Sequence, residues 1–293
     1  NNGNSSIDKF HLYRLLDESL RFSNEEALYE SAISKMLVDE DIFVTSENRY
    51  ALSMLYFAEK RILDFFARRK DEKNRKIIAT FDEYLIKKQQ TLGFELSTEQ
   101  KKAVELINNG DKTLFLIGYA GTGKSTSSRA ILELLEETMS YDDIMTIALS
   151  GIASQRISDT TGYNSSTIQS LLMKHKEKDF FPYKAILLDE ASMVNSVTFY
   201  QIISKIADDT IFIIVGDDGQ LPAIGAGNVL ADAIKYELAP ICKLTKIYRQ
   251  NENQAIAVIA NDIRRGEVPA YKEEYEDFKF IDVSISNYYA LKN

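Results

Sequence analysis

The chain has 293 residues, of which 45% are hydrophobic, and a formal net charge of −9 at pH 7. This hydrophobic fraction is ample for a packed core and excludes a disordered chain, and the length favours about two domains. No apolar run approaches the ~20 residues of a membrane-spanning helix, and no signal-peptide pattern opens the chain. The acidic balance argues only weakly against a nucleic-acid partner, because a protein that binds a strand in a cleft needs only local positive charge.

The single cysteine, Cys242, excludes an intramolecular disulfide bond and is typical of a protein from the reducing cytoplasm. The two histidines, His11 and His175, stand far apart with no cysteine partners. A zinc site would need such partners. We therefore predict a cytoplasmic protein without a zinc ion.

Residues 7–90 are predicted to form a small, mainly helical N-terminal domain. Apolar residues recur there at helical spacing: Ala51, Leu55, Ala58, Ile62 and Phe65. The stretch 41–45 (DIFVT) is interpreted as one short strand. A cluster of basic residues follows the helix: Arg68, Arg69, Lys70, Lys73, Arg75 and Lys76. Its simplest interpretation is a solvated helix end or linker, and contact with nucleic acid is the alternative.

The pattern changes after Gly93, and short apolar runs then alternate with helical segments. The runs are residues 113–117, 145–149, 185–188 and 210–215. Strands that are apolar throughout are buried on both faces, which is typical of a parallel sheet covered by helices. We therefore predict that residues 91–293 form an α/β nucleotide-binding domain.

The strongest motif is GYAGTGKS, residues 118–125, which matches a phosphate-binding P-loop and lies between a predicted strand and a predicted helix. Its glycines let backbone N–H groups cradle phosphate oxygens at a helix N-terminus. Lys124 is expected to reach the β- and γ-phosphates of ATP, and the Ser125 hydroxyl to bind Mg²⁺. The predicted nucleotide-binding residues here are Gly118, Ala120, Gly121, Thr122, Gly123, Lys124, Ser125 and Thr126.

Two further strand ends carry polar side chains. Asp189 and Glu190 follow the strand at 185–188, where Asp189 is expected to bind Mg²⁺ and Glu190 to act as the catalytic base that polarises the attacking water. Gln220 follows the strand at 210–215 in the turn GDDGQLP. Its uncharged amide is expected to sense the γ-phosphate of ATP.

These motifs together resemble the superfamily 1 DNA helicases of the RecD type (exodeoxyribonuclease V alpha-subunit-like) over residues 92–269. LSTEQ at 96–100 is similar to the family's Q motif, which implies that Gln100 reads adenine. DEAS at 189–192 and GDDGQLPAIGAGNVL at 216–230 resemble the family's next elements. LTKIYRQ at 244–250 is similar to an element whose arginine, here Arg249, approaches the γ-phosphate.

The resemblance also implies a track for single-stranded DNA. The segments ALSGIAS (148–154) and TIQ (167–169) stand where the family contacts the strand. Ser150, Thr167 and Gln169 are the residues expected to bind DNA. Ile152 and Gln169 depart from the family pattern, in which arginine and histidine are usual.

The implied fold is the first RecA-like P-loop domain of an ATP-dependent helicase that moves 5′ to 3′ along single-stranded DNA in recombination or repair. The second motor domain is expected to lie outside the sequence, so that this chain would bind nucleotide but hydrolyse ATP slowly and not unwind DNA alone. The full protein could belong to a nuclease and helicase complex. The alternatives are a conjugation helicase associated with a relaxase, a Pif1-like helicase, and a P-loop ATPase switch that does not unwind DNA.

Overall fold

A six-stranded parallel sheet organises the computed structural model, which describes residues 6–19, 26–46, 49–93, 95–246, 259, 262–263 and 266–268. The strand order is β6-β5-β7-β8-β4-β9. The strands are β4 (Thr113–Gly118), β5 (Ile144–Ala148), β6 (Ser165–Thr167), β7 (Ala185–Leu188), β8 (Ile211–Gly216) and β9 (Ile241–Leu244). The predicted parallel α/β fold is therefore confirmed, with the four predicted strands at its centre and β6 and β9 added at the edges.

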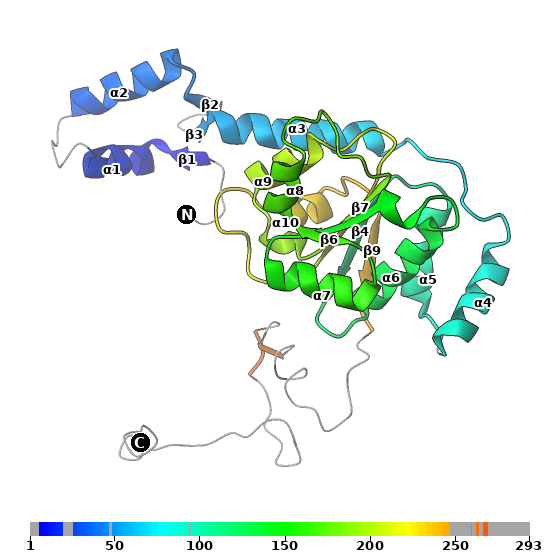
Figure 1. Cartoon of the computed structure of the whole chain (residues 1–293). Coiled ribbons are helices and arrows are strands. Elements are labelled where there is room, and N and C mark those ends of the chain that lie inside the picture. The colour runs from blue at the N-terminus through cyan, green and yellow to red at the C-terminus, as the bar shows by residue number, and fades with distance from the viewer. Residues whose placement is uncertain are drawn as a thin grey trace, which may run out of the picture.

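Helices cover both faces of this sheet, so each central strand is buried along its whole length (Figure 1). One face packs against α3 (Ser53–Arg69), α8 (Ile168–Lys174), α9 (Ser196–Ile203) and α10 (Val229–Lys235). The other packs against α4 (Phe81–Leu92), α5 (Thr98–Asn108), α6 (Lys124–Leu135) and α7 (Gly151–Thr161). No helix in the described part of the chain has the length and apolar character that crossing a bilayer requires.

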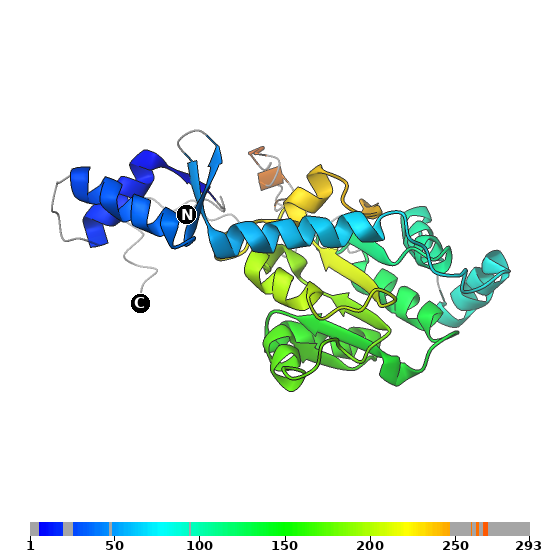
Figure 2. The same ribbon diagram turned by 90° about the horizontal axis from the view of Figure 1, so that it is seen from above.

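The N-terminal region contains a second, three-stranded antiparallel sheet of order β1-β3-β2. Its elements are β1 (Ser6–Asp8), α1 (Lys9–Ser19), α2 (Glu26–Val38), β2 (Ile42–Ser46) and β3 (Arg49–Leu52). They enclose a small core of Leu12, Ile33 and Ile42 at the N-terminal end of α3, away from the large sheet (Figures 1 and 2). The strand predicted at 41–45 is confirmed as β2, whereas β1 and β3 replace predicted helix.

Helix α3 lies along the large sheet and belongs to its core (Figure 2). Phe65 and Phe66 are 4% and 0% exposed, and Phe66 stacks at a tilt on Phe115 of β4 and Phe199 of α9. Because these aromatic contacts join α3 to the sheet, we propose that the domain boundary lies before α3 and not near residue 90.

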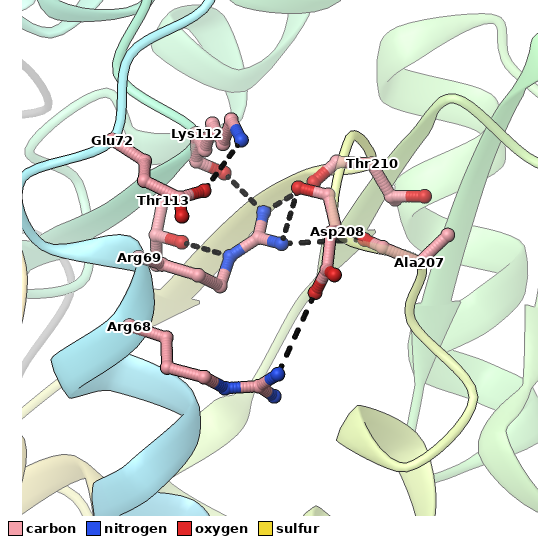
Figure 3. A network of polar contacts seen from close by, with 8 residues as sticks. All are labelled: Arg68, Arg69, Glu72, Lys112, Thr113, Ala207, Asp208 and Thr210. Carbon is pink, nitrogen blue, oxygen red and sulfur yellow. Dashed lines mark hydrogen bonds and ion pairs between the residues drawn. The ribbon is translucent and has the colours of Figure 1, made fainter.

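Arg69, in the last turn of α3, fixes this helix to the sheet (Figure 3). The side chain is buried, and Nε donates a hydrogen bond to the Thr113 hydroxyl at 3.0 Å. The two terminal nitrogens donate to four backbone carbonyls, those of Lys112, Ala207, Asp208 and Thr210. Burial lowers the pKa of Arg69 to about 10 while the carboxylates of Asp208 and Glu72 oppose this shift, so the guanidinium stays charged at neutral pH.

This network corrects one part of the sequence interpretation. Arg69 is neither a solvated side chain nor a contact for nucleic acid, since the protein's own backbone uses its donors at the amino-terminal ends of β4 and β8. Its neighbour Arg68 fits the solvated interpretation: its side chain is 65% exposed and lies 3.8 Å from Asp208.

Replacing Arg69 with Met is expected to lower the free energy of unfolding by ~3 kcal/mol or more, because several buried carbonyl groups would lose their donor. The matched change Arg68→Met removes one exposed ion pair and should cost less than ~0.5 kcal/mol. Urea unfolding curves of the two variants and the parent measure both values. Equal, small losses for the two arginines would contradict the role given to Arg69.

Candidate active site

The predicted motifs meet at one edge of the sheet. Strands β7, β8 and β4 are neighbours and parallel, so the polar loops at their carboxyl ends converge. They line a cavity of about 390 Å³. Its wall contains Gln100, Tyr119, Ala120, Gly121, Gly123, Lys124, Ser125, Thr126, Ser128, Arg156, Ile157, Thr160, Asp189, Glu190, Val215 and Gln220.

The P-loop takes its shape from glycine. Gly121 and Gly123 have φ values of 83° and 88°, in the left-handed region that residues with a side chain rarely adopt. Gly118 leaves no room for a side chain because Thr122 and Leu244 fill the adjacent space. Helix α6 starts immediately after the loop, so its N-terminus and backbone N–H groups face the cavity.

The side chains of the loop divide into lining and supporting residues. Lys124 lies over the loop, where its ammonium donates to the carbonyls of Gly118 and, at 3.0 Å, of Tyr119. Ser125 lines the cavity beside it. Thr122, predicted to bind nucleotide, is 1% exposed and donates its hydroxyl to the Tyr119 carbonyl at 2.8 Å, which supports the loop from behind. Gly118 and Thr122 are not part of the cavity wall.

Gln100 reaches the cavity from the first turn of α5. Its backbone and side chain form a capping box with Ser97, in which Oε1 accepts from the Ser97 N–H at 2.9 Å. The remaining amide nitrogen lies 3.5 Å from the carbonyl oxygen of Gly123. Gln100 therefore links α5 to the P-loop, and its role in reading adenine stays a prediction.

Asp189 and Glu190 line the same cavity, directly after β7. Burial raises the pKa of the Asp189 carboxyl, while the Glu190 N–H, at 2.9 Å from Oδ1, and the charges of Lys124 and Arg156 act in the opposite direction. Glu190 has φ 53° and ψ 38°, a left-handed conformation that costs on the order of 1 kcal/mol for a residue other than glycine. Such strain is concentrated at functional sites, which supports the catalytic prediction for Glu190.

The donor set at this wall fits one hard divalent cation. The described residues contain no group of three or more histidine, cysteine, aspartate or glutamate side chains that would enclose a metal by themselves. Mg²⁺ typically takes one or two protein oxygens and completes its shell with phosphates and water. The Ser125 hydroxyl and the Asp189 carboxylate, both from residues that line the cavity, provide such a pair.

Gln220 reaches the cavity from the turn after β8, where the Asp217 carboxylate accepts from the Gly219 N–H at 2.9 Å and shapes the turn. The Gln220 Oε1 accepts a hydrogen bond from the Ser192 hydroxyl at 2.9 Å. Gln220 and the P-loop therefore line the same cavity, and the role of Gln220 at the γ-phosphate stays a prediction. Arg249, the remaining predicted catalytic residue, lies outside the described residues.

Sequence reasoning missed two features of the site. Arg156 and Thr160 line the cavity from successive turns of α7, and Arg156 places a positive charge near Asp189. Glu99 holds the segment after β9, because its carboxylate accepts from the Thr245 N–H at 2.8 Å and from the Lys246 N–H at 3.4 Å. A lone arginine or glutamate on a predicted helix gives no signal of either role.

The predicted DNA-binding residues lie at the same edge of the sheet but outside the nucleotide cavity. Strands β5 and β6 are neighbours, with Ala148 paired to Thr167, so Ser150, two residues after β5, and Thr167, at the end of β6, lie at the same edge of the sheet. Both hydroxyls cap helices: Ser150 accepts from the Ala153 N–H and Thr167 from the Ser170 N–H, each at 3.1 Å. Two helix N-termini therefore meet at this surface, a geometry that suits phosphate groups.

A family model described as an AAA domain matches residues 95–284. The ATP-dependent RecD2 DNA helicase of Deinococcus radiodurans is 27% identical over 280 residues, which cover 90% of this chain and 37% of the relative. The RecBCD enzyme subunit RecD of Mycolicibacterium smegmatis is 27% identical over 209 residues, covering 61% of this chain and 37% of the subunit.

A third relative comes from conjugation. The probable conjugal transfer protein TraA of Sinorhizobium fredii is 32% identical over 188 residues, covering 61% of this chain and 16% of that protein. The match to the Deinococcus radiodurans helicase covers 37% of that protein, so this chain spans little more than a third of its length. These matches confirm the resemblance to RecD-type helicases that the motifs predict.

Proposed function

This chain belongs to the AAA domain family, and on that premise we propose that it is the ATP-hydrolysing part of a helicase that moves along single-stranded DNA. The observation that carries the proposal is the convergence of Lys124, Asp189, Glu190 and Gln220 on one cavity. A P-loop alone needs only the phosphate cradle. A paired carboxylate and an amide at the same cavity add the groups that hydrolysis requires.

The proposed chemistry assigns each side chain one task. The P-loop N–H groups and Lys124 bind the phosphates, which offsets their negative charge. Glu190 accepts a proton from the water that attacks the γ-phosphorus, and the Gln220 amide orients that water or the phosphate. Ser125 and Asp189 would hold Mg²⁺, which neutralises phosphate charge when it is bound.

Single-stranded DNA is the proposed partner. The surface formed by Ser150, Thr167 and Gln169 combines two helix N-termini with exposed polar side chains. Contacts of this kind read the strand's backbone, so we expect weak sequence preference and a strong dependence on salt. Movement 5′ to 3′, a role in recombination or repair, and assembly with a nuclease are proposed by analogy with the RecD relatives, as is a cytoplasmic location.

A conjugation helicase is the second candidate, because a probable conjugal transfer protein is 32% identical to this chain over 188 residues. A switch that uses ATP without unwinding is the third. A strand-displacement assay on the full-length protein separates the two helicase candidates from the switch, with duplexes that carry a 5′ or a 3′ single-stranded tail. Displacement from the 5′-tailed duplex is expected. ATP turnover with no displacement from either duplex would favour the switch.

Replacing Arg156 with Ala is expected to weaken binding of a non-hydrolysable ATP analogue roughly tenfold while leaving ADP binding nearly unchanged. Arg156 lies at the end of the cavity that holds Asp189, so a charge-assisted contact with the third phosphate would be lost. Titration calorimetry with both nucleotides measures the two affinities, and Arg68→Ala is the matched control. Equal weakening of both nucleotides would contradict this placement.

A further inference from the structure

We propose that Ser192 is a positioning residue, which sets the orientation of the Gln220 amide and thereby tunes ATP turnover. The inference rests on the proposed function, because it assigns a partner to a side chain of that site. Ser192 is the last residue of the DEAS motif, and it does not itself line the nucleotide cavity. Its influence on the reaction therefore has to pass through Gln220.

The contact joins a buried donor to an exposed acceptor. Ser192 is 6% exposed, and its hydroxyl donates to Gln220 Oε1 at 2.9 Å. Gln220 is exposed to solvent where it lines the cavity. A long, exposed side chain normally samples several rotamers. The buried hydroxyl is the fixed partner that selects one of them.

The chemistry of the amide explains why the orientation matters. A glutamine side chain ends in one acceptor oxygen and one NH₂ group with two donors. Because Ser192 occupies the oxygen, the NH₂ group remains available to the cavity. Phosphate oxygens accept hydrogen bonds only, so this orientation is attractive. The flipped amide would present its oxygen to the phosphate and repel it.

Neighbouring contacts keep the two segments in register. The Asn195 side-chain amide donates to the Ile224 carbonyl at 3.2 Å, and the Ser196 N–H donates to the Ala226 carbonyl at 3.2 Å. Together with the Ser192 contact, these bonds connect residues 192–196 to residues 220–226 at three points. The turn after Glu190 is therefore held firmly against the segment that carries Gln220.

The same turn carries the proposed catalytic base. Glu190, in its left-handed conformation, precedes the short helix η2 (Ala191–Met193), in which the Met193 N–H returns to the Glu190 carbonyl at 3.1 Å. Only one residue separates Glu190 from Ser192. A movement of Gln220 at the γ-phosphate would therefore displace Glu190, because the Ser192–Gln220 hydrogen bond and the tight turn from Glu190 to Met193 connect the two side chains.

The test is a double-mutant cycle on the full-length protein, with kcat for ATP hydrolysis, ADP affinity and the thermal unfolding midpoint measured for each variant. Ser192→Ala is expected to lower kcat roughly 3- to 10-fold, the scale of one neutral hydrogen bond, with ADP affinity unchanged. Gln220→Ala should lower kcat at least as much. The double variant should be no slower than Gln220→Ala, because Ser192 acts only through Gln220.

Two further variants keep the test decisive if Ser192→Ala folds poorly. Gln220→Glu changes an exposed side chain, retains an acceptor for Ser192 and removes both amide donors, so it should be as slow as Gln220→Ala. Ser204→Ala, an exposed serine at the end of α9 that donates to the Gln201 carbonyl, is the matched control and should keep the parent's kcat.

The outcomes separate this inference from the function on which it rests. Equal losses from Ser192→Ala in the parent and in Gln220→Ala would overturn the positioning role, as would a Ser192→Ala variant with the parent's kcat. Full activity in Gln220→Glu would also overturn it. Absence of ATP hydrolysis in the parent protein would overturn the proposed function itself.

Discussion

Replacing Glu190 with Gln is expected to lower ATP turnover about 10²- to 10⁴-fold while leaving nucleotide binding intact. The substitution keeps the size of the side chain and removes its ability to accept a proton from water. Binding should persist because the P-loop and Lys124, which line the same cavity, are left unchanged and hold the phosphates. Steady-state hydrolysis in the full-length protein and calorimetric titration of ATP measure the two effects separately.

The control for this change is Glu137→Gln, which removes an exposed carboxylate just after α6 and outside the cavity wall. Its turnover should match that of the parent. The left-handed backbone at residue 190 should be the same in Glu190→Gln as in the parent, because glutamine and glutamate have the same backbone preferences. Near-normal turnover in Glu190→Gln would therefore refute the catalytic role and leave Asp189 as the carboxylate to examine.

Replacing Lys124 with Ala is expected to abolish measurable nucleotide binding. The ammonium is the charged group of the P-loop, and without it the loop offers the phosphates only backbone N–H groups and the dipole of α6. The fold should survive, because the side chain lines the cavity and its ammonium donates to the backbone carbonyls of Gly118 and Tyr119 in the loop. Calorimetry with ATP and ADP measures binding, and circular dichroism follows the fold.

Lys102→Ala provides the matched control, since Lys102 is an exposed lysine on α5 paired with Glu105 at 3.1 Å. Its nucleotide affinity should equal that of the parent. If Lys124→Ala bound ATP as tightly as the parent did, the phosphate site would have to lie elsewhere in the cavity.

The centre of the fold could be predicted because its signals are local. Strands β4, β5, β7 and β8 are runs of apolar residues, and such runs are typical of buried parallel strands. The edge strands lack this signal: β6 is Ser-Ser-Thr, and β9 is interrupted by the exposed Lys243. Their pairing is decided by the neighbouring strand, which the local sequence does not reveal.

Arg69 shows a different limit of sequence reasoning. Within a run of basic residues, one arginine is buried against five oxygen acceptors while its neighbour Arg68 is exposed. Nothing in the residue types distinguishes the two. The difference arises from the direction in which α3 meets the amino-terminal ends of β4 and β8, a property of the tertiary structure.

The residues of the candidate site that follow apolar strands were predictable from the sequence. Lys124, Asp189, Glu190 and Gln220 each follow an apolar strand, and parallel strands bring such ends together. Ser192 could have been suspected from its place in DEAS, although its partner depends on which two turns face each other. Arg156 comes from a helix, where only the packing of α7 beside the cavity turns it toward the nucleotide site.

The most direct test of the proposed function is ATP turnover by the full-length protein, measured with and without single-stranded DNA at low and at high salt. If the strand stimulates the motor, ATP turnover should be at least about tenfold faster with DNA than without it. This stimulation should fall as the salt concentration rises, because salt screens the contacts with the DNA phosphates. Turnover that is the same with and without DNA at every salt concentration would contradict a DNA motor.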